Sequence, residues 1–75
     1  MAIYLCENIK RLRQEKGITQ ETLADFLGVT FQSISRWERG DGYPDITLLP
    51  AIASFFGKSV DNLLGINKIE QERKL

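Results

Sequence analysis

The sequence predicts an all-α fold, a compact bundle of five short helices. Apolar residues recur three and four positions apart along the chain, and no stretch shows the alternating pattern of a strand. Glycines and residues with capping side chains divide the chain into segments of helical length. With 75 residues, of which 43% are hydrophobic, the chain is large enough for one small core.

The first predicted helix ends before Gly17, because glycine commonly terminates helices. Lys16 lies in its last turn, where a positive charge interacts favourably with the helix dipole. Its apolar residues recur at helical spacing and define one buried face: Leu5, Ile9 and Leu12.

Two further helices are predicted on either side of Gly28, which can adopt the left-handed conformation that ends a helix. Thr19 and Thr30 each precede one of these helices and offer a hydroxyl N-cap, and Gly40 ends the second of the two. Their apolar residues form one seam in each helix: Leu23 and Leu27, then Ile34 and Trp37. Two helices joined in this way, with polar side chains on the outer face of the second, have the shape that enters a DNA major groove.

A fourth helix is expected after the turn-rich loop 41–44, with Asp45 as its N-cap and Gly57 as its end. Its apolar positions share one face: Ile46, Leu49, Ile52, Ala53 and Phe56. Pro50 is expected to cost this helix one backbone hydrogen bond and to bend its first turn.

A short fifth helix is predicted over residues 60–64, between the N-cap Ser59 and Gly65. The five helices make up one domain, residues 1–65. The remaining segment, residues 66–75, is charged and rich in strong helix formers. It is either a frayed end or the start of a helix that links this domain to another. We favour the second interpretation, in which a sensor domain lies beyond Leu75.

The composition excludes several classes of protein. The chain has no histidine and a single cysteine, Cys6, which excludes histidine-based catalysis, a zinc site and an internal disulfide. We therefore expect neither an enzyme nor a metal or other cofactor. No apolar run approaches the roughly 20 residues that span a bilayer, and no basic region precedes an apolar stretch at the N-terminus. A cytoplasmic protein without membrane association is expected.

The net charge is zero, with ten basic and ten acidic residues. Phosphate neutralisation dominates the affinity of proteins for DNA, so a DNA-binding role implies few phosphate contacts for this chain. One copy is then expected to bind weakly, and dimerisation is expected to matter more than usual for affinity.

From Leu5 to Gly65 the chain resembles the Cro/repressor-type (xenobiotic-response-element) helix-turn-helix family of bacterial and phage transcription regulators. The segments that carry the resemblance are IKRLRQEKGITQETLADFLGVTFQSISRWERG and PDITLLPAIASFFGKSVDNLLG. The glutamine, alanine and turn-glycine positions of the family are matched by Gln20, Ala24 and Gly28. Its apolar positions are matched by Leu23, Leu27, Val29, Ile34 and Trp37. The resemblance implies a lambda-repressor-like bundle, with the helix-turn-helix formed by the second and third helices.

The resemblance also implies sequence-specific binding of double-stranded DNA by a transcription regulator, a repressor that acts as a homodimer on a palindromic operator. The recognition helix is about Thr30–Arg39, and the expected base contacts are Phe31, Gln32, Ser33 and Arg36. The expected contacts with the DNA backbone are Lys10, Thr19, Gln20, Thr30, Arg39 and Tyr43. Arg13 and Glu38 match a structural ion pair of the family that links the first helix to the end of the third.

Several alternatives stay open at this point. Lys10 is either a backbone contact or a solvated cation, and Arg36 contacts guanine, a phosphate or a neighbouring carboxylate. Arg39 contacts a phosphate or complements the negative end of its helix. Phe55 belongs either to the edge of the core or to a dimer contact. A protein-interaction module, such as an antitoxin or adaptor, would use the same bundle, and its acidic residues would be Asp41, Asp45 and Asp61.

Overall fold

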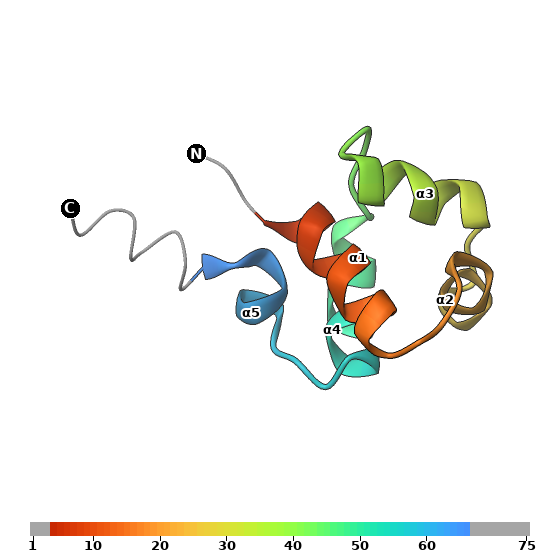
Figure 1. The fold of residues 1–75 in the computed structure, drawn as a ribbon. Helices are drawn as coiled ribbons and strands as arrows, with labels where there is room; N and C mark the ends of the chain where they lie inside the picture. The colour runs from red at the N-terminus through yellow and green to blue at the C-terminus, as the bar shows by residue number, and fades with distance from the viewer. Residues whose placement is uncertain (1–3, 67–75) are drawn as a thin grey trace.

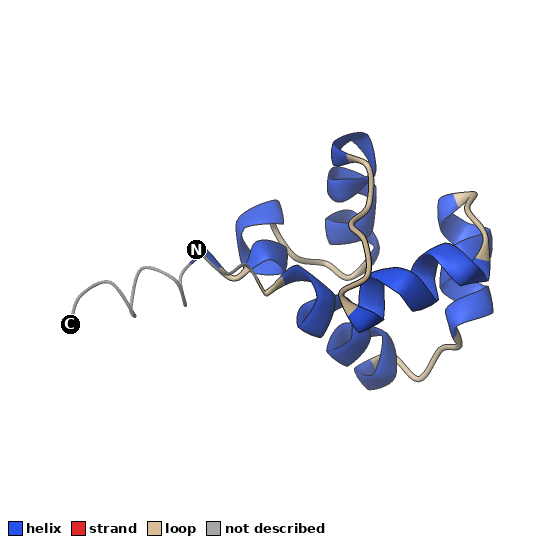
Figure 2. Ribbon diagram, turned by 90° about the horizontal axis from the view of Figure 1, so that it is seen from above, coloured by secondary structure: helices blue, strands red, loops and turns tan. Residues whose placement is uncertain are grey.

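The computed structural model describes residues 4–66, which form helices and connecting loops without a strand (Figures 1 and 2). Its elements are α1 (Leu5–Glu15), α2 (Gln20–Leu27), α3 (Phe31–Arg39), the 3₁₀ helix η1 (Ile46–Leu48), α4 (Leu49–Phe55) and α5 (Val60–Leu64). Helix α1 packs against both α3 and α5, while α2 packs against α3 and α4 against α5. The predicted all-α bundle is confirmed over the described range. Except for Ile66, the predicted tail lies outside the described residues. No helix within 4–66 has the length and apolarity needed to cross a membrane.

Hydroxyl side chains begin three of the helices. The side-chain oxygens of Thr19, Thr30 and Ser59 each accept a hydrogen bond from the backbone N–H three residues further on, at 3.0, 3.2 and 3.1 Å. Each cap satisfies one of the donors that the first helical turn leaves unpaired. Gly28 and Gly40 end α2 and α3 with φ angles of 72° and 79°, a conformation that strains other residues. These predicted boundaries are confirmed, and they fix the length and the start of α3.

The buried apolar residues form a single cluster to which every α-helix contributes. One fully buried side chain comes from each of α1 to α5 in turn: Ile9, Leu23, Ile34, Ile52 and Leu63. Trp37 belongs to the same cluster and is only 7% exposed. The inner face of α3 is therefore anchored in the core, and its outer face is the part that is free to contact a ligand.

The start of the fourth helix differs from the sequence prediction. Asp45 accepts a hydrogen bond from the backbone N–H of Thr47 at 3.0 Å, and a 3₁₀ turn follows instead of the α-helix. The N–H of Leu49 donates to the carbonyl of Ile46, and Pro50 has no N–H with which to form the α-helical bond to that oxygen. Helix α4 therefore begins at Leu49.

Pro50 lies in the first turn of α4, where backbone donors have no partner within the helix. Its missing N–H costs the bond to the Ile46 carbonyl that a helix starting at Ile46 would have formed. One expectation about this region is wrong. Ile46 does not lie on the buried face, because the 3₁₀ turn rotates it away from the core and leaves it 77% exposed.

Aromatic side chains join α2 to α4 at the edge of the core. The ring of Phe55 lies 4.4 Å from that of Phe26 and 5.0 Å from that of Phe56, measured between centroids. The ammonium group of Lys16 lies 5.2 Å from the centroid of the Phe55 ring, within range of a cation–π interaction. Phe55 is half-buried and packs against the core cluster, as the first of its two interpretations predicts. Its role in a dimer contact stays a prediction.

Candidate nucleic-acid interface

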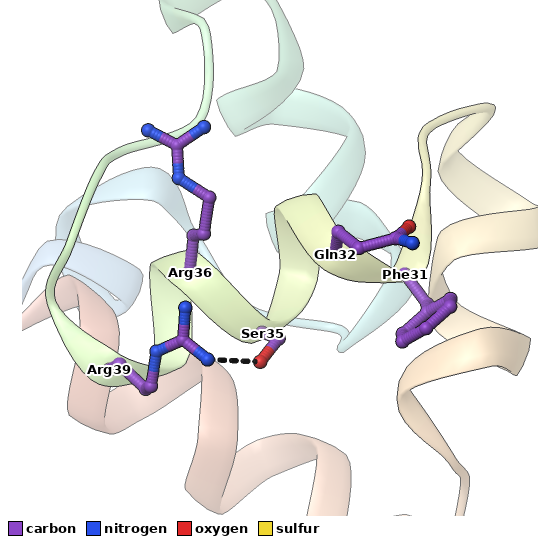
Figure 3. A pocket seen from close by; sticks show the side chains of 5 residues that line it. All are labelled: Phe31, Gln32, Ser35, Arg36 and Arg39. Atoms are coloured by element: carbon purple, nitrogen blue, oxygen red, sulfur yellow. Dashed lines mark hydrogen bonds between the residues drawn. The ribbon is translucent and has the colours of Figure 1, made fainter.

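The outer face of α3 carries a shallow hollow of about 300 Å³ (Figure 3). The side chains that line it are Phe31, Gln32, Ser35, Arg36 and Arg39. They form two adjacent rows along one helix, with intervals of three or four residues between neighbours, so together they cover one face. The core anchors the opposite face of α3, and the hollow is therefore an outward surface that combines an aromatic ring, an amide, a hydroxyl and two guanidinium groups.

Phe31 and Gln32 lie at the N-terminal end of this surface, on the first turn of α3 (Figure 3). The side chain of Phe31 is 45% exposed, and Gln32 is also exposed. A glutamine amide offers one donor and one acceptor together, the pattern that adenine presents in the major groove. A half-exposed aromatic ring can contact the methyl group of thymine. The two side chains therefore present complementary chemistry for an A·T base pair.

Arg36 and Arg39 lie toward the C-terminal end of the same surface, and their guanidinium groups point apart (Figure 3). Arg36 lies against the loop after α3, where a β-carbon added to Gly42 would be 3.4 Å from its Nη2. Within residues 4–66, no carboxylate forms an ion pair with Arg36. Arg39 donates from Nε to Asp41 Oδ2 at 3.0 Å and from Nη1 to the hydroxyl of Ser35 at 3.1 Å. Arg36 thus keeps its hydrogen-bonding capacity, whereas Arg39 is engaged within the protein.

Ser33 does not line the hollow, although it is among the expected base contacts. Its backbone N–H donates to the hydroxyl oxygen of Thr30 at 3.2 Å, and the two hydroxyl oxygens are 3.1 Å apart. Ser33 is therefore part of the N-terminal cap of α3. Ser35, which is not among the expected base contacts, lines the hollow instead. The signal was present, because Ser35 is four residues from both Phe31 and Arg39.

An ion pair joins α1 to the C-terminal half of α3. Arg13 donates to the carboxylate of Glu38 through Nε at 2.6 Å and through Nη2 at 3.0 Å, and Nη1 donates to the carbonyl of Ile18 at 2.9 Å. The side chains of Arg13 and Glu38 are only 13% and 4% exposed. Hydrogen bonding to Glu38 raises the pKa of the Arg13 guanidinium above its usual value. The pair is a fixed link that sets the position of α3 relative to α1.

Gln20, at the start of α2, extends this network. Its Nε2 donates to Glu38 Oε1 at 3.1 Å, which connects the first turn of α2 to α3. A side-chain amide nitrogen carries two hydrogens, so this bond leaves the second one available. The position of Gln20 is therefore fixed by the bundle before any ligand arrives.

The remaining expected backbone contacts are on the surface. Lys10 lies exposed on α1, and Tyr43 is 61% exposed in the loop that follows α3. Thr19 and Thr30 are exposed at the starts of α2 and α3, where their hydroxyl oxygens already accept the capping hydrogen bonds. Contacts between these four residues and phosphate groups stay predictions.

Two helices joined by a tight turn at Gly28, with the second exposing polar side chains, define a helix-turn-helix protein. A family model described as "Helix-turn-helix" matches residues 9–63, and the chain belongs to this family, whose Cro/repressor-type members it resembles. The curated relatives that match this chain are named as HTH-type transcriptional regulators.

Two curated relatives show the extent of the likeness. The chain is 45% identical over 58 residues to the HTH-type transcriptional activator BcrR of Enterococcus faecalis, an alignment that covers 77% of this chain and 28% of that protein. It is 40% identical over 58 residues to the SPbeta prophage-derived uncharacterized HTH-type transcriptional regulator YonR of Bacillus subtilis, with 77% and 54% covered. The chain therefore spans only part of the length of these relatives.

Solved structures show the same fold. A transcriptional regulator from Listeria innocua superposes with a TM-score of 0.83 and 31% identity, over 87% of this chain and 61% of that one. The P22 c2 repressor, solved in complex with a synthetic operator, superposes with a TM-score of 0.75 and 33% identity. That likeness covers 80% of this chain and 91% of the repressor chain.

Proposed function

We propose that the chain is a sequence-specific, double-stranded DNA-binding domain that inserts α3 into the major groove. The observation that carries the proposal is the hollow on α3, whose outward side chains lie opposite a seam anchored by Ile34 and Trp37. A helix held in this way presents its outer face as a rigid unit, and a major groove is wide enough to admit it. The likeness to the P22 c2 repressor, whose structure contains an operator, supports the same docking mode.

The base contacts in this proposal come from the first two turns of α3. Gln32 pairs with adenine, Phe31 contacts a thymine methyl group, and Arg36 donates to guanine O6 and N7. Ser33 contributes through its hydroxyl group, beside the cap. Arg36 is suited to its role because none of the described carboxylates pairs with it.

The backbone contacts position the helix and carry no sequence information. Thr19, Gln20 and Thr30 lie where α2 and α3 begin, and helix N-termini attract phosphate through unpaired N–H groups and the helix dipole. Lys10 and Arg39 add positive charge, and Tyr43 adds a hydroxyl donor from the loop.

The regulator that contains this domain acts as a homodimer in the cytoplasm. Two copies would bind half-sites about 10 base pairs apart, or a multiple of one turn, because each recognition helix must face the same side of the duplex. Bound to its operator, the dimer would repress transcription by excluding the polymerase. The likeness covers only 28% of BcrR and 54% of YonR, which supports a domain that belongs to a longer regulator, and we place a sensor domain beyond Leu75.

The experiment compares two alanine variants on a duplex chosen by selection and on its single-base variants. Gln32→Ala is expected to cost about 1–3 kcal/mol and to relax preference at one or two base pairs. Lys10→Ala is expected to weaken binding to every duplex alike and to lower the salt slope by about 1. If Gln32→Ala instead weakens all duplexes equally, the assignment of Gln32 to a base is wrong. Salt-insensitive binding to a protein, without duplex binding, would identify the protein-interaction module instead.

A further inference from the structure

A carboxylate lies beside the C-terminal end of α3. Asp41 follows the last residue of α3 by two positions and accepts a hydrogen bond from Arg39 Nε at 3.0 Å. Its backbone N–H donates to the carbonyl of Arg36 at 2.9 Å, after Gly40 has turned the chain in the left-handed conformation. The backbone of Asp41 is therefore fixed at the end of the helix, within reach of the Arg39 side chain.

The position of Asp41 is unfavourable for the helix itself. The C-terminus of a helix carries a partial negative charge, which repels an acidic side chain and attracts a basic one. The ion pair with Arg39 offers little compensation, since both side chains are 60% exposed and exposed pairs are weak. Helix stability therefore does not explain why a carboxylate lies here. Its pairing with Arg39 instead reduces the positive charge that α3 can offer to DNA.

We propose that Asp41 masks Arg39 from the phosphate backbone and thereby lowers the affinity of the domain for duplex DNA of any sequence. The inference rests on the proposed function. Arg39 is one of two cations that line the hollow, and two of its guanidinium nitrogens are already bonded, to Asp41 and to Ser35. A phosphate that approaches Arg39 competes with the carboxylate for Nε and meets its negative charge.

The consequence is a domain that depends on its base contacts and on dimerisation. Binding without sequence preference is essentially electrostatic, so each masked cation removes part of it. The ten basic residues of the chain are balanced by ten acidic ones, so no net positive charge offsets the loss of one cation. The masking of Arg39 therefore keeps a single copy from binding tightly to random sequence.

The test is the affinity of the whole chain for a short duplex of randomised sequence, measured by fluorescence anisotropy over a series of salt concentrations. The variant is Asp41→Asn, and the matched control is Asp61→Asn, which changes the net charge by the same amount. Asp61 is exposed on α5, and α1 packs between α5 and α3 (Figure 1). Because Asn has nearly the shape of Asp, both variants should fold, and circular dichroism checks this.

Asp41→Asn is expected to bind the duplex about three- to tenfold more tightly than the unaltered chain at low salt. The slope of log affinity against log salt concentration should be steeper by about 0.9, the value for one further phosphate contact. Asp61→Asn is expected to change both quantities much less. In a chain that also carries Arg39→Gln, Asp41→Asn should add no more than Asp61→Asn does, because the masked cation is gone.

Equal effects of Asp41→Asn and Asp61→Asn would overturn the inference and leave the proposed function intact, since net charge alone would then account for the gain. A gain from Asp41→Asn that persists with Arg39→Gln would overturn it as well. If neither the unaltered chain nor any variant binds duplex at low salt, the proposed function is wrong and the inference falls with it.

Discussion

Removal of Arg13 is expected to be the most damaging change at any charged residue of the described bundle. Arg13→Ala leaves the carboxylate of Glu38, only 4% exposed, without the guanidinium that satisfies both of its oxygens. The amide of Gln20 would be its one remaining partner among the described residues. Because a buried charge without a counter-charge is costly, the variant should be strongly destabilised.

The expected loss is about 3–5 kcal/mol, the usual cost of removing one partner of a buried pair. A domain of this size has a total free energy of unfolding on the order of 5–10 kcal/mol, so the loss is a large share of it. Since each kcal/mol lowers Tm by about 4–8 °C in a small domain, Tm should fall by roughly 12–40 °C. The raised pKa of Arg13 means that its contribution is complete below the usual arginine pKa and is lost only in strong alkali.

The assay is urea and thermal unfolding followed by circular dichroism, with Arg11→Ala as the control. Arg11 lies on the same helix and also pairs with a glutamate, Glu15, at 3.1 Å, but these side chains are 60% and 54% exposed. Loss of such an exposed pair should cost no more than about 1 kcal/mol. A second variant, Arg13→Met with Glu38→Met, should be more stable than Arg13→Ala, because no buried charge is left alone.

Equal, small losses from Arg13→Ala and Arg11→Ala would contradict this expectation. They would mean that the orientation of α3 depends on apolar packing and not on the ion pair. A double methionine variant less stable than Arg13→Ala would show that the isolated carboxylate of Glu38 is not the source of the loss.

Two further predictions concern the ends of helices. Gly65→Ala should destabilise the fold more than Gly57→Ala. Both glycines have positive φ, but only at Gly65 would the new β-carbon meet a side chain, 2.7 Å from Tyr4 Cδ2. Thermal melts of the two variants compare the losses, and equal losses would mean that the Tyr4 side chain moves aside at no cost. A hydrogen bond from the backbone N–H of Thr47 lowers the pKa of Asp45 in the folded chain below its ordinary 3.8. The stability that this bond contributes is therefore present above pH 3.8 and is lost as the pH falls through the lowered pKa. Asp45→Asn cannot titrate and should therefore lose less stability than the unaltered chain between about pH 5 and about pH 2 in urea melts; identical losses would contradict this.

The sequence predicts the bundle well because its signals are local. A hydroxyl at an N-cap and a glycine at a C-terminus act within one turn, and both occur around α2 and α3. Ile34 and Trp37 are three residues apart and fall together on the buried face, as helical spacing requires. The same spacing places Phe31, Gln32 and Arg36 on the outward surface.

The sequence does not predict contacts that depend on competition between bonds. The 3₁₀ turn before α4 arises because Asp45 bonds two residues on and Pro50 lacks an N–H. Ser33 is a candidate for base contact by position, but its proximity to Thr30 places it in the cap. The pairing of Arg39 with Asp41 depends on the rotamer of a long side chain at the end of a helix, which the spacing of residues in the sequence does not determine.

Base recognition by α3 is tested most directly by selection of the purified chain on a randomised duplex pool, followed by sequencing. Selection is done at low salt and repeated at physiological salt, because the higher salt concentration weakens binding that depends on phosphates alone. We expect enrichment of a two-fold symmetric sequence with half-sites about one helical turn, or a multiple of it, apart. Recovery of a pool with no enriched sequence at either salt concentration would contradict base recognition by α3.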